Sequence, residues 1–174
     1  MPLYRFHIES SVPTEVVIAR IHGLVREAPT FWSSLKEQFG SRPDNSPPFI
    51  GTVEGSAFHI RRDIRYRNSF LPRIHGQVAA SRLGTRIDIT MSLHPLVTIF
   101  MLFWLGGVGF GGFAAAPTNP KDALIPMGMF AFGLALTLGG FFPEAFKARR
   151  LLEQSLTGAQ PIAPDDAKKI RAGR

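Results

Sequence analysis

The sequence predicts an α+β membrane protein, in which a small antiparallel sheet with helices on one face precedes a two-helix transmembrane hairpin and a cytoplasmic helical extension. One observation is the distribution of charge along the 174 residues: Ile89 to Pro120 contains no Asp, Glu, Lys or Arg, and neither does Ala123 to Pro143. Two such stretches argue against a single soluble domain. The other observation is that the preceding residues alternate between apolar and polar side chains, as half-buried strands do. These features divide the chain into a cytoplasmic domain (1–93), a hairpin (94–143) and a cytoplasmic helix with a flexible tail (144–174).

The first domain begins with a strand and two helices. Leu3 to Glu9 alternates, with three apolar side chains on one face. Ser10, Ser11 and Pro13 are typical of a helix start, and an apolar series at helical spacing follows until Pro29 ends it. That series consists of Val17, Ile21, Leu24 and Ala28, flanked by Ile18 and Val25. A second short helix is expected from Phe31 to Phe39, closed by Gly40, and residues 41–48 are expected to form a loop.

Four further strands complete the predicted sheet. Alternation or a short apolar run predicts strands over residues 49–54, 57–67, 73–80 and 85–93, with turns at 55–56 and 81–84. Phe58, Ile60, Ile64 and Tyr66 share the inward face of the second of these, and Arg62 interrupts that face. Runs of strands and helices in this order favour two layers.

The two uncharged stretches are predicted to be membrane spans, approximately over 95–116 and 123–142. Each is long enough to cross the hydrocarbon core as a helix. Pro95 and Pro126 are expected in first helical turns, and the connection 117–122 is short enough to require an antiparallel hairpin. Residues 1–90 contain 12 basic and 8 acidic residues and residues 144–174 contain 7 and 4, whereas Lys121 is the only basic residue between them. The positive-inside rule therefore places both termini in the cytoplasm and the loop outside. The predicted location is the bacterial inner membrane, as a multi-pass protein.

Small residues recur every four positions on both spans, which would allow close helix approach. They are Gly107, Gly111 and Ala115 on the first span, and Ala131, Ala135 and Gly139 on the second. For most of this surface we expect the two rows to face each other within the hairpin; docking against another integral membrane protein is the alternative. Eight phenylalanines and Trp104 leave contact with a lipid, quinone or pigment open, but they specify no cofactor, and none is predicted. The absence of charge inside the spans argues against transport.

The outward face of the sheet is predicted to be basic. It collects His59, Arg61, Arg65, Arg67, Arg73, His75 and Arg86. Such a face could bind anionic lipid or an acidic protein surface, and an ordinary solvated face is the alternative. No nucleic-acid signature accompanies it, so nucleic acid is not a predicted partner.

No catalytic signature is present. The chain has no cysteine, which excludes cysteine nucleophiles and cysteine-ligated metals. Four residues on or near the basic face, His59, Asp63, His75 and Asp88, are of metal-ligating type, but no spacing holds them together, and no metal site is predicted. His94, at the head of the first span, is expected to serve as a helix-start residue rather than as a ligand for haem or chlorophyll.

Several short runs resemble uncharacterised bacterial two-span membrane proteins over approximately residues 49–150: Phe49-Ile-Gly-Thr-Val, Phe58-His-Ile-Arg-Arg, Arg65-Tyr-Arg-Asn-Ser-Phe-Leu-Pro, Gly84-Thr-Arg-Ile and Leu93-His-Pro. That resemblance implies no catalytic residue. The opening elements also resemble a helix-grip ligand-binding domain, although the first span stands where the closing helix is expected, which argues against a ligand cavity.

The predicted function is that of a non-catalytic accessory subunit of a larger membrane complex, such as a respiratory or photosynthetic one. A membrane-tethered lipid- or ligand-sensing module is the alternative.

Overall fold

The computed structural model describes residues 2–27, 46–64, 66–82, 84–117 and 119–157. Within them lie strands β1 (Pro2–Ser10), β2 (Val25–Arg26), β3 (Phe49–Glu54), β4 (Ala57–Arg62), β5 (Arg73–Ser81) and β6 (Gly84–Ser92), and helices α1 (Thr14–Leu24), α3 (Pro95–Ala115) and α4 (Pro120–Leu156). The strands form one sheet in the order β1-β6-β5-β4-β3-β2. Every neighbouring pair is antiparallel except β2 and β3. The α+β class is confirmed.

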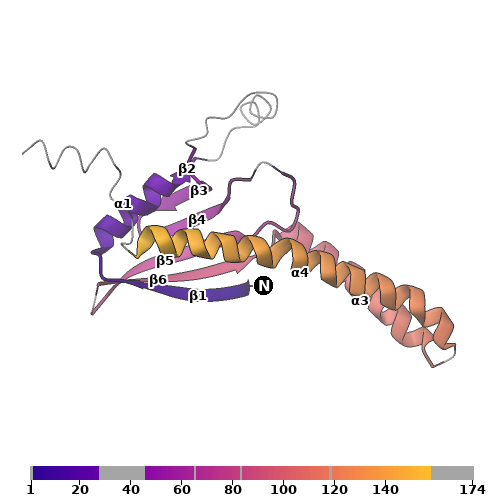
Figure 1. The fold of residues 1–174 in the computed structure, drawn as a ribbon. Coiled ribbons are helices and arrows are strands. Elements are labelled where there is room, and N and C mark those ends of the chain that lie inside the picture. Colours follow the sequence, from indigo (N-terminus) through magenta and orange to yellow (C-terminus); the bar gives the residue numbers. More distant parts are fainter. Residues whose placement is uncertain (1, 28–45, 65, 83, 118, 158–174) are drawn as a thin grey trace, which may run out of the picture.

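One face of the sheet is covered by α1 and by the second half of α4 (Figure 1). Alternating apolar side chains of the strands point toward these helices, because successive strand residues face opposite sides. The fully buried members of this core include Val17, Ile21, Phe58, Ile74, Ile87, Ile89 and Met91. The opposite face of the sheet carries the polar members of the same strands. We call this opposite side the outer face.

Helix α4 is continuous over 37 residues and joins the apolar hairpin to the sheet domain (Figure 1). Its buried stripe of Phe141, Ala145, Ala148, Leu152 and Leu156 recurs every three or four residues and packs on the sheet. The Ser10 hydroxyl donates a hydrogen bond of 2.8 Å to the carbonyl oxygen of Leu156, which anchors the helix end. The helix after the second stretch is therefore part of the core. The expectation that the first span replaces the helix closing the sheet is wrong, because α4 covers that face.

Several predicted boundaries change. The first helix ends at Leu24, where Val25 is extended and begins β2, because pairing with β3 competes with a further helical turn. Strand β4 ends at Arg62 rather than at residue 67. Pro126 lies inside α4, which begins at Pro120, and not in a first turn. The short helix expected over 31–39 and most of the loop after it lie outside the described residues.

By length and composition, α3 and α4 could each cross a membrane. The most apolar window of each helix is largely exposed: 11% of that of α3 and 17% of that of α4 is buried. The junction between β6 and α3 is short: Ser92 ends β6 and Pro95 begins α3. His94 caps α3, as its Nδ1 accepts a hydrogen bond of 3.1 Å from the Leu96 amide. Its expected place at the helix start is confirmed.

Candidate functional site

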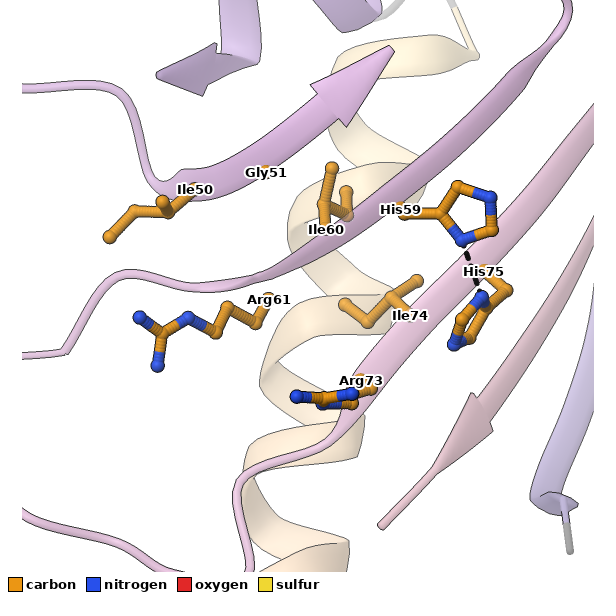
Figure 2. Close-up of a pocket in the computed structure, with 8 residues that line it drawn as sticks. All are labelled: Ile50, Gly51, His59, Ile60, Arg61, Arg73, Ile74 and His75. Atoms are coloured by element: carbon orange, nitrogen blue, oxygen red, sulfur yellow. Dashed lines mark hydrogen bonds between the residues drawn. The ribbon is translucent and has the colours of Figure 1, made fainter. Parts of the chain in front are cut away.

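The central strands bring four basic side chains together on the outer face. In the register of β4 and β5, His59 lies opposite His75 and Arg61 lies opposite Arg73. Directly opposed Cβ atoms are about 5 Å apart, and positions two residues apart share a face. These four residues therefore form one compact group, which we call the basic tetrad (Figure 2).

The two histidines of the tetrad touch. Their Nδ1 atoms are 2.6 Å apart, so one Nδ1 donates a proton and the other accepts it. Burial lowers the pKa of His75 from its ordinary value, and the positive charges of His59 and Arg73 lower it further. Protonation of His75 is therefore disfavoured unless a negative charge approaches it.

No acidic residue compensates the tetrad from the neighbouring strands. The residues opposite its four members on β3 and β6 are neutral: Ile50 faces Arg61, Thr52 faces His59, Thr90 faces His75 and Ser92 faces Arg73. Within the described part of the chain, neither Arg61 nor Arg73 makes an ion pair. Like charges directly opposite each other destabilise a sheet. The tetrad is thus an uncompensated positive site.

A hollow of about 190 Å³ opens on the tetrad. Figure 2 shows the histidine pair on one side of it and the side chains of Arg61 and Arg73 on the other, with Ile50 on the adjacent strand. A second hollow of about 300 Å³ shares Arg73 and His75 with the first and extends to Leu93, Pro95, Thr98 and Ile99. The basic site therefore continues to the first turns of α3.

The other members of the predicted basic face are placed differently. Arg86 lies on the outer face toward the opposite end of β6 and pairs with Asp88 at 3.0 Å. Arg67 follows β4 in the connection to β5 and lines a separate hollow with Arg61 and Arg62. Arg65 lies outside the described residues. Of the predicted basic-face residues that the structure describes, four therefore lie together in the basic tetrad, and Arg67 and Arg86 lie outside it.

Of the four residues of metal-ligating type, the two histidines touch, but the two aspartates are paired elsewhere. Asp63 pairs with Arg26 at 3.3 Å, and Asp88 pairs with Arg86. Among the described residues, no group of three or more His, Asp or Glu side chains could hold a metal ion.

A second polar cluster, which the sequence reasoning missed, lies where α4 leaves the apolar hairpin. Glu144 is 3% exposed and accepts hydrogen bonds from Arg62, from the Tyr66 hydroxyl at 2.6 Å and from Lys147 Nζ at 3.1 Å. We call these four residues the Glu144 cluster. Two signals in the sequence pointed to it: Arg62 interrupts an inward face, and Glu144 interrupts the apolar stripe of α4.

Ionisation in the Glu144 cluster follows from its contacts. Burial raises the pKa of Glu144, but hydrogen bonds from Tyr66 and Lys147 and the charge of Arg62 outweigh burial, so its pKa is lowered overall. The same hydrogen bond raises the pKa of Tyr66. The carboxylate is therefore charged at neutral pH and holds the β4–β5 connection against α4.

Two further contacts join this connection to α4 beside Pro143. Asn68 Nδ2 donates a hydrogen bond of 2.9 Å to the carbonyl oxygen of Gly140. The Asn68 side chain therefore holds the connection against α4 within one turn of Pro143. A Cβ on Gly140 would lie 2.9 Å from the Phe70 side chain, so only glycine allows this approach.

The hairpin closes through residues other than the predicted rows. A Cβ added at Gly109 would lie 3.2 Å from the Phe130 ring, and one at Gly112 would lie 3.0 Å from Met127. A Cβ at Gly107, Gly111 or Gly139 would meet nothing within 4 Å. Ala131 and Ala135 are also exposed, whereas Ala115 is partly buried.

The expectation that these two rows face each other is therefore wrong. The reason is helix phase: the contact face lies about one or two residues away from each row, where Gly109, Gly112 and Gly133 provide the close approach. A role for the rows in packing against another protein stays a prediction.

Comparisons with protein-family models, with curated proteins and with solved structures found no match for this chain.

Proposed function

We propose that the protein is a non-catalytic accessory subunit of a larger bacterial membrane complex. In this proposal the hairpin inserts into the inner membrane, both termini are cytoplasmic and the sheet domain lies against the membrane surface. The observation that carries the proposal is that the small-residue rows point away from the hairpin's own interface. Such rows allow a neighbouring helix to approach closely in a membrane. Respiratory and photosynthetic assemblies are candidate complexes.

The test is purification of the full-length protein from its native membrane in a mild detergent, followed by mass spectrometry. We expect at least one integral membrane protein in stoichiometric amount. The Gly111→Leu variant should lose this partner and keep the melting temperature of the isolated protein, because position 111 faces away from α4. Recovery of the wild type as a lone chain would contradict the proposal.

Membrane topology is tested separately with single cysteines, since the native chain has none. Ala116→Cys and Gln154→Cys place a thiol at two exposed positions, one at the end of α3 and one near the end of α4. An impermeant reagent applied from outside the inner membrane should label position 116 and leave position 154 unlabelled. The reverse pattern would overturn the orientation, and labelling of both positions or of neither would contradict a hairpin whose two ends lie on opposite sides of the membrane.

A membrane-tethered lipid- or ligand-sensing module is the second candidate. The uncompensated charge of the basic tetrad favours it, because such a site gains stability when an anion binds. The two candidates are separable, since loss of a partner and loss of a bound anion are measured independently.

A further inference from the structure

The basic tetrad lies next to the start of the apolar hairpin. Arg73 is opposite Ser92, and α3 begins three residues after Ser92. The two hollows share Arg73 and His75, so a continuous surface leads from the tetrad to Thr98 and Ile99 on α3. One end of this surface is positive and the other is apolar, since Ile99 is 63% exposed.

We propose that this surface binds one anionic phospholipid, with its phosphate at the basic tetrad and its acyl chains along the first turns of α3. Arginine is suited to the phosphate because its guanidinium can donate two parallel hydrogen bonds to phosphate oxygens. Hydroxyl groups of Thr52, Thr90 and Ser92 border the tetrad on the same face. The anion offsets the repulsion between the opposed arginines, which no acidic side chain does in the described structure.

A lipid is favoured over a soluble phosphate by the apolar end of the surface. A free phosphate would use the charge of the tetrad and leave the exposed side chain of Ile99 uncovered. A lipid covers both ends, and removal of its acyl chains from water contributes favourably to binding. The inference rests on the proposed insertion of the hairpin into a membrane and does not depend on a protein partner.

The experiment is a titration of the full-length protein in a non-ionic detergent, followed by native mass spectrometry. The probes are dioctanoyl phosphatidate, dioctanoyl phosphatidylcholine and glycerol 3-phosphate. We expect phosphatidate to bind at least about tenfold more tightly than phosphatidylcholine, the difference that one charge-assisted contact supplies. It should also bind more tightly than glycerol 3-phosphate, which carries the same phosphate but lacks the acyl chains. Tight binding of glycerol 3-phosphate would identify a soluble phosphate as the ligand and overturn the lipid proposal, as would equal affinity for the two lipids.

The test variant is Arg61→Gln/Arg73→Gln, in which phosphatidate should bind no better than phosphatidylcholine. The matched control is Arg82→Gln/Arg86→Gln, which removes the same charge at the far end of the sheet and should retain the preference. Equal losses in both variants would indicate general electrostatic attraction and overturn the proposal, as would retained affinity in the test variant.

Folding of the test variant is checked by its melting temperature, which should be no lower than that of the wild type, because removal of opposed like charges relieves repulsion.

The conservative variant Arg61→Lys/Arg73→Lys keeps the charge and provides a second test. It should bind phosphatidate more tightly than the glutamine variant. Equal weakness of the two variants would contradict an electrostatic role for these side chains. Partners that co-purify with the wild type should remain with every tetrad variant, so failure of this inference is distinguishable from failure of the accessory-subunit proposal.

Discussion

Replacement of Glu144 by alanine is expected to weaken the junction between the apolar hairpin and the sheet domain. The carboxylate is the common acceptor for Arg62, Tyr66 and Lys147, and its side chain is 4% exposed. Its removal leaves Arg62, whose side chain is 20% exposed, without its counter-ion. Lys147 contributes little to the loss, because its side chain is 60% exposed and can turn to water.

The size of the effect follows from burial. Removing one partner of a buried ion pair typically costs about 3–5 kcal/mol, since the remaining charge is left uncompensated. For a chain of this length, each kcal/mol lowers the melting temperature by about 2–4 °C. The Glu144→Ala variant is therefore expected to melt about 6–20 °C below the wild type.

The assay is thermal unfolding of the full-length protein in a mild detergent, followed by circular dichroism. The control is Arg86→Ala, which removes an exposed ion pair with Asp88 on β6 and should have a much smaller effect on the melting temperature. The double variant Arg62→Met/Glu144→Leu removes both charges of the buried pair, so it should be more stable than Glu144→Ala. If Glu144→Ala melts within 2 °C of the wild type, or if the double variant is the less stable of the two, the reasoning is wrong.

Three further predictions follow from other contacts. Gly76→Ala should destabilise the sheet by about 1–3 kcal/mol, because a Cβ there would lie 1.9 Å from the buried Phe58 ring. Its control is Gly23→Ala, which should be neutral or stabilising because a Cβ at position 23 would meet nothing within 4 Å. A Gly76→Ala variant as stable as the wild type would contradict this prediction. Gly109→Leu should lower the melting temperature in detergent by wedging α3 from α4, and Gly111→Leu should not; equal effects would refute the placement of the contact face. The lowered pKa of Glu144 means that its stabilisation is present above the ordinary value of 4.5 and is lost as pH falls through the lower folded value, so melting temperatures should fall on acidification below about pH 4.5. This dependence should be weaker in Glu144→Gln, and an unchanged slope would show that another group titrates.

Local pattern was sufficient for much of the fold. Strand alternation predicted β1, β3, β5 and β6 to within one or two residues, because one face of each strand is buried and the other is not. The uncharged stretches predicted two long apolar helices for the same kind of reason, since exclusion of charge is a property of composition. The end of α1 at Leu24 was not predictable in this way, because it depends on pairing with a strand more than twenty residues later.

Register and helix phase decided what local pattern left open. The sequence by itself determined that the sheet would carry basic residues, but only the pairing of β4 with β5 places His59 against His75 and Arg61 against Arg73. The rows of small residues are visible in the sequence. The face of α3 that contacts α4, however, depends on the relative rotation of the two helices, and residue spacing within one helix does not specify that rotation. The Glu144 cluster shows the same limit across a longer distance. Arg62 and Glu144 are 82 residues apart, and in the sequence each is only a charged residue on an otherwise apolar face. Because α4 packs back over the sheet, the two charges meet and form one buried ion pair.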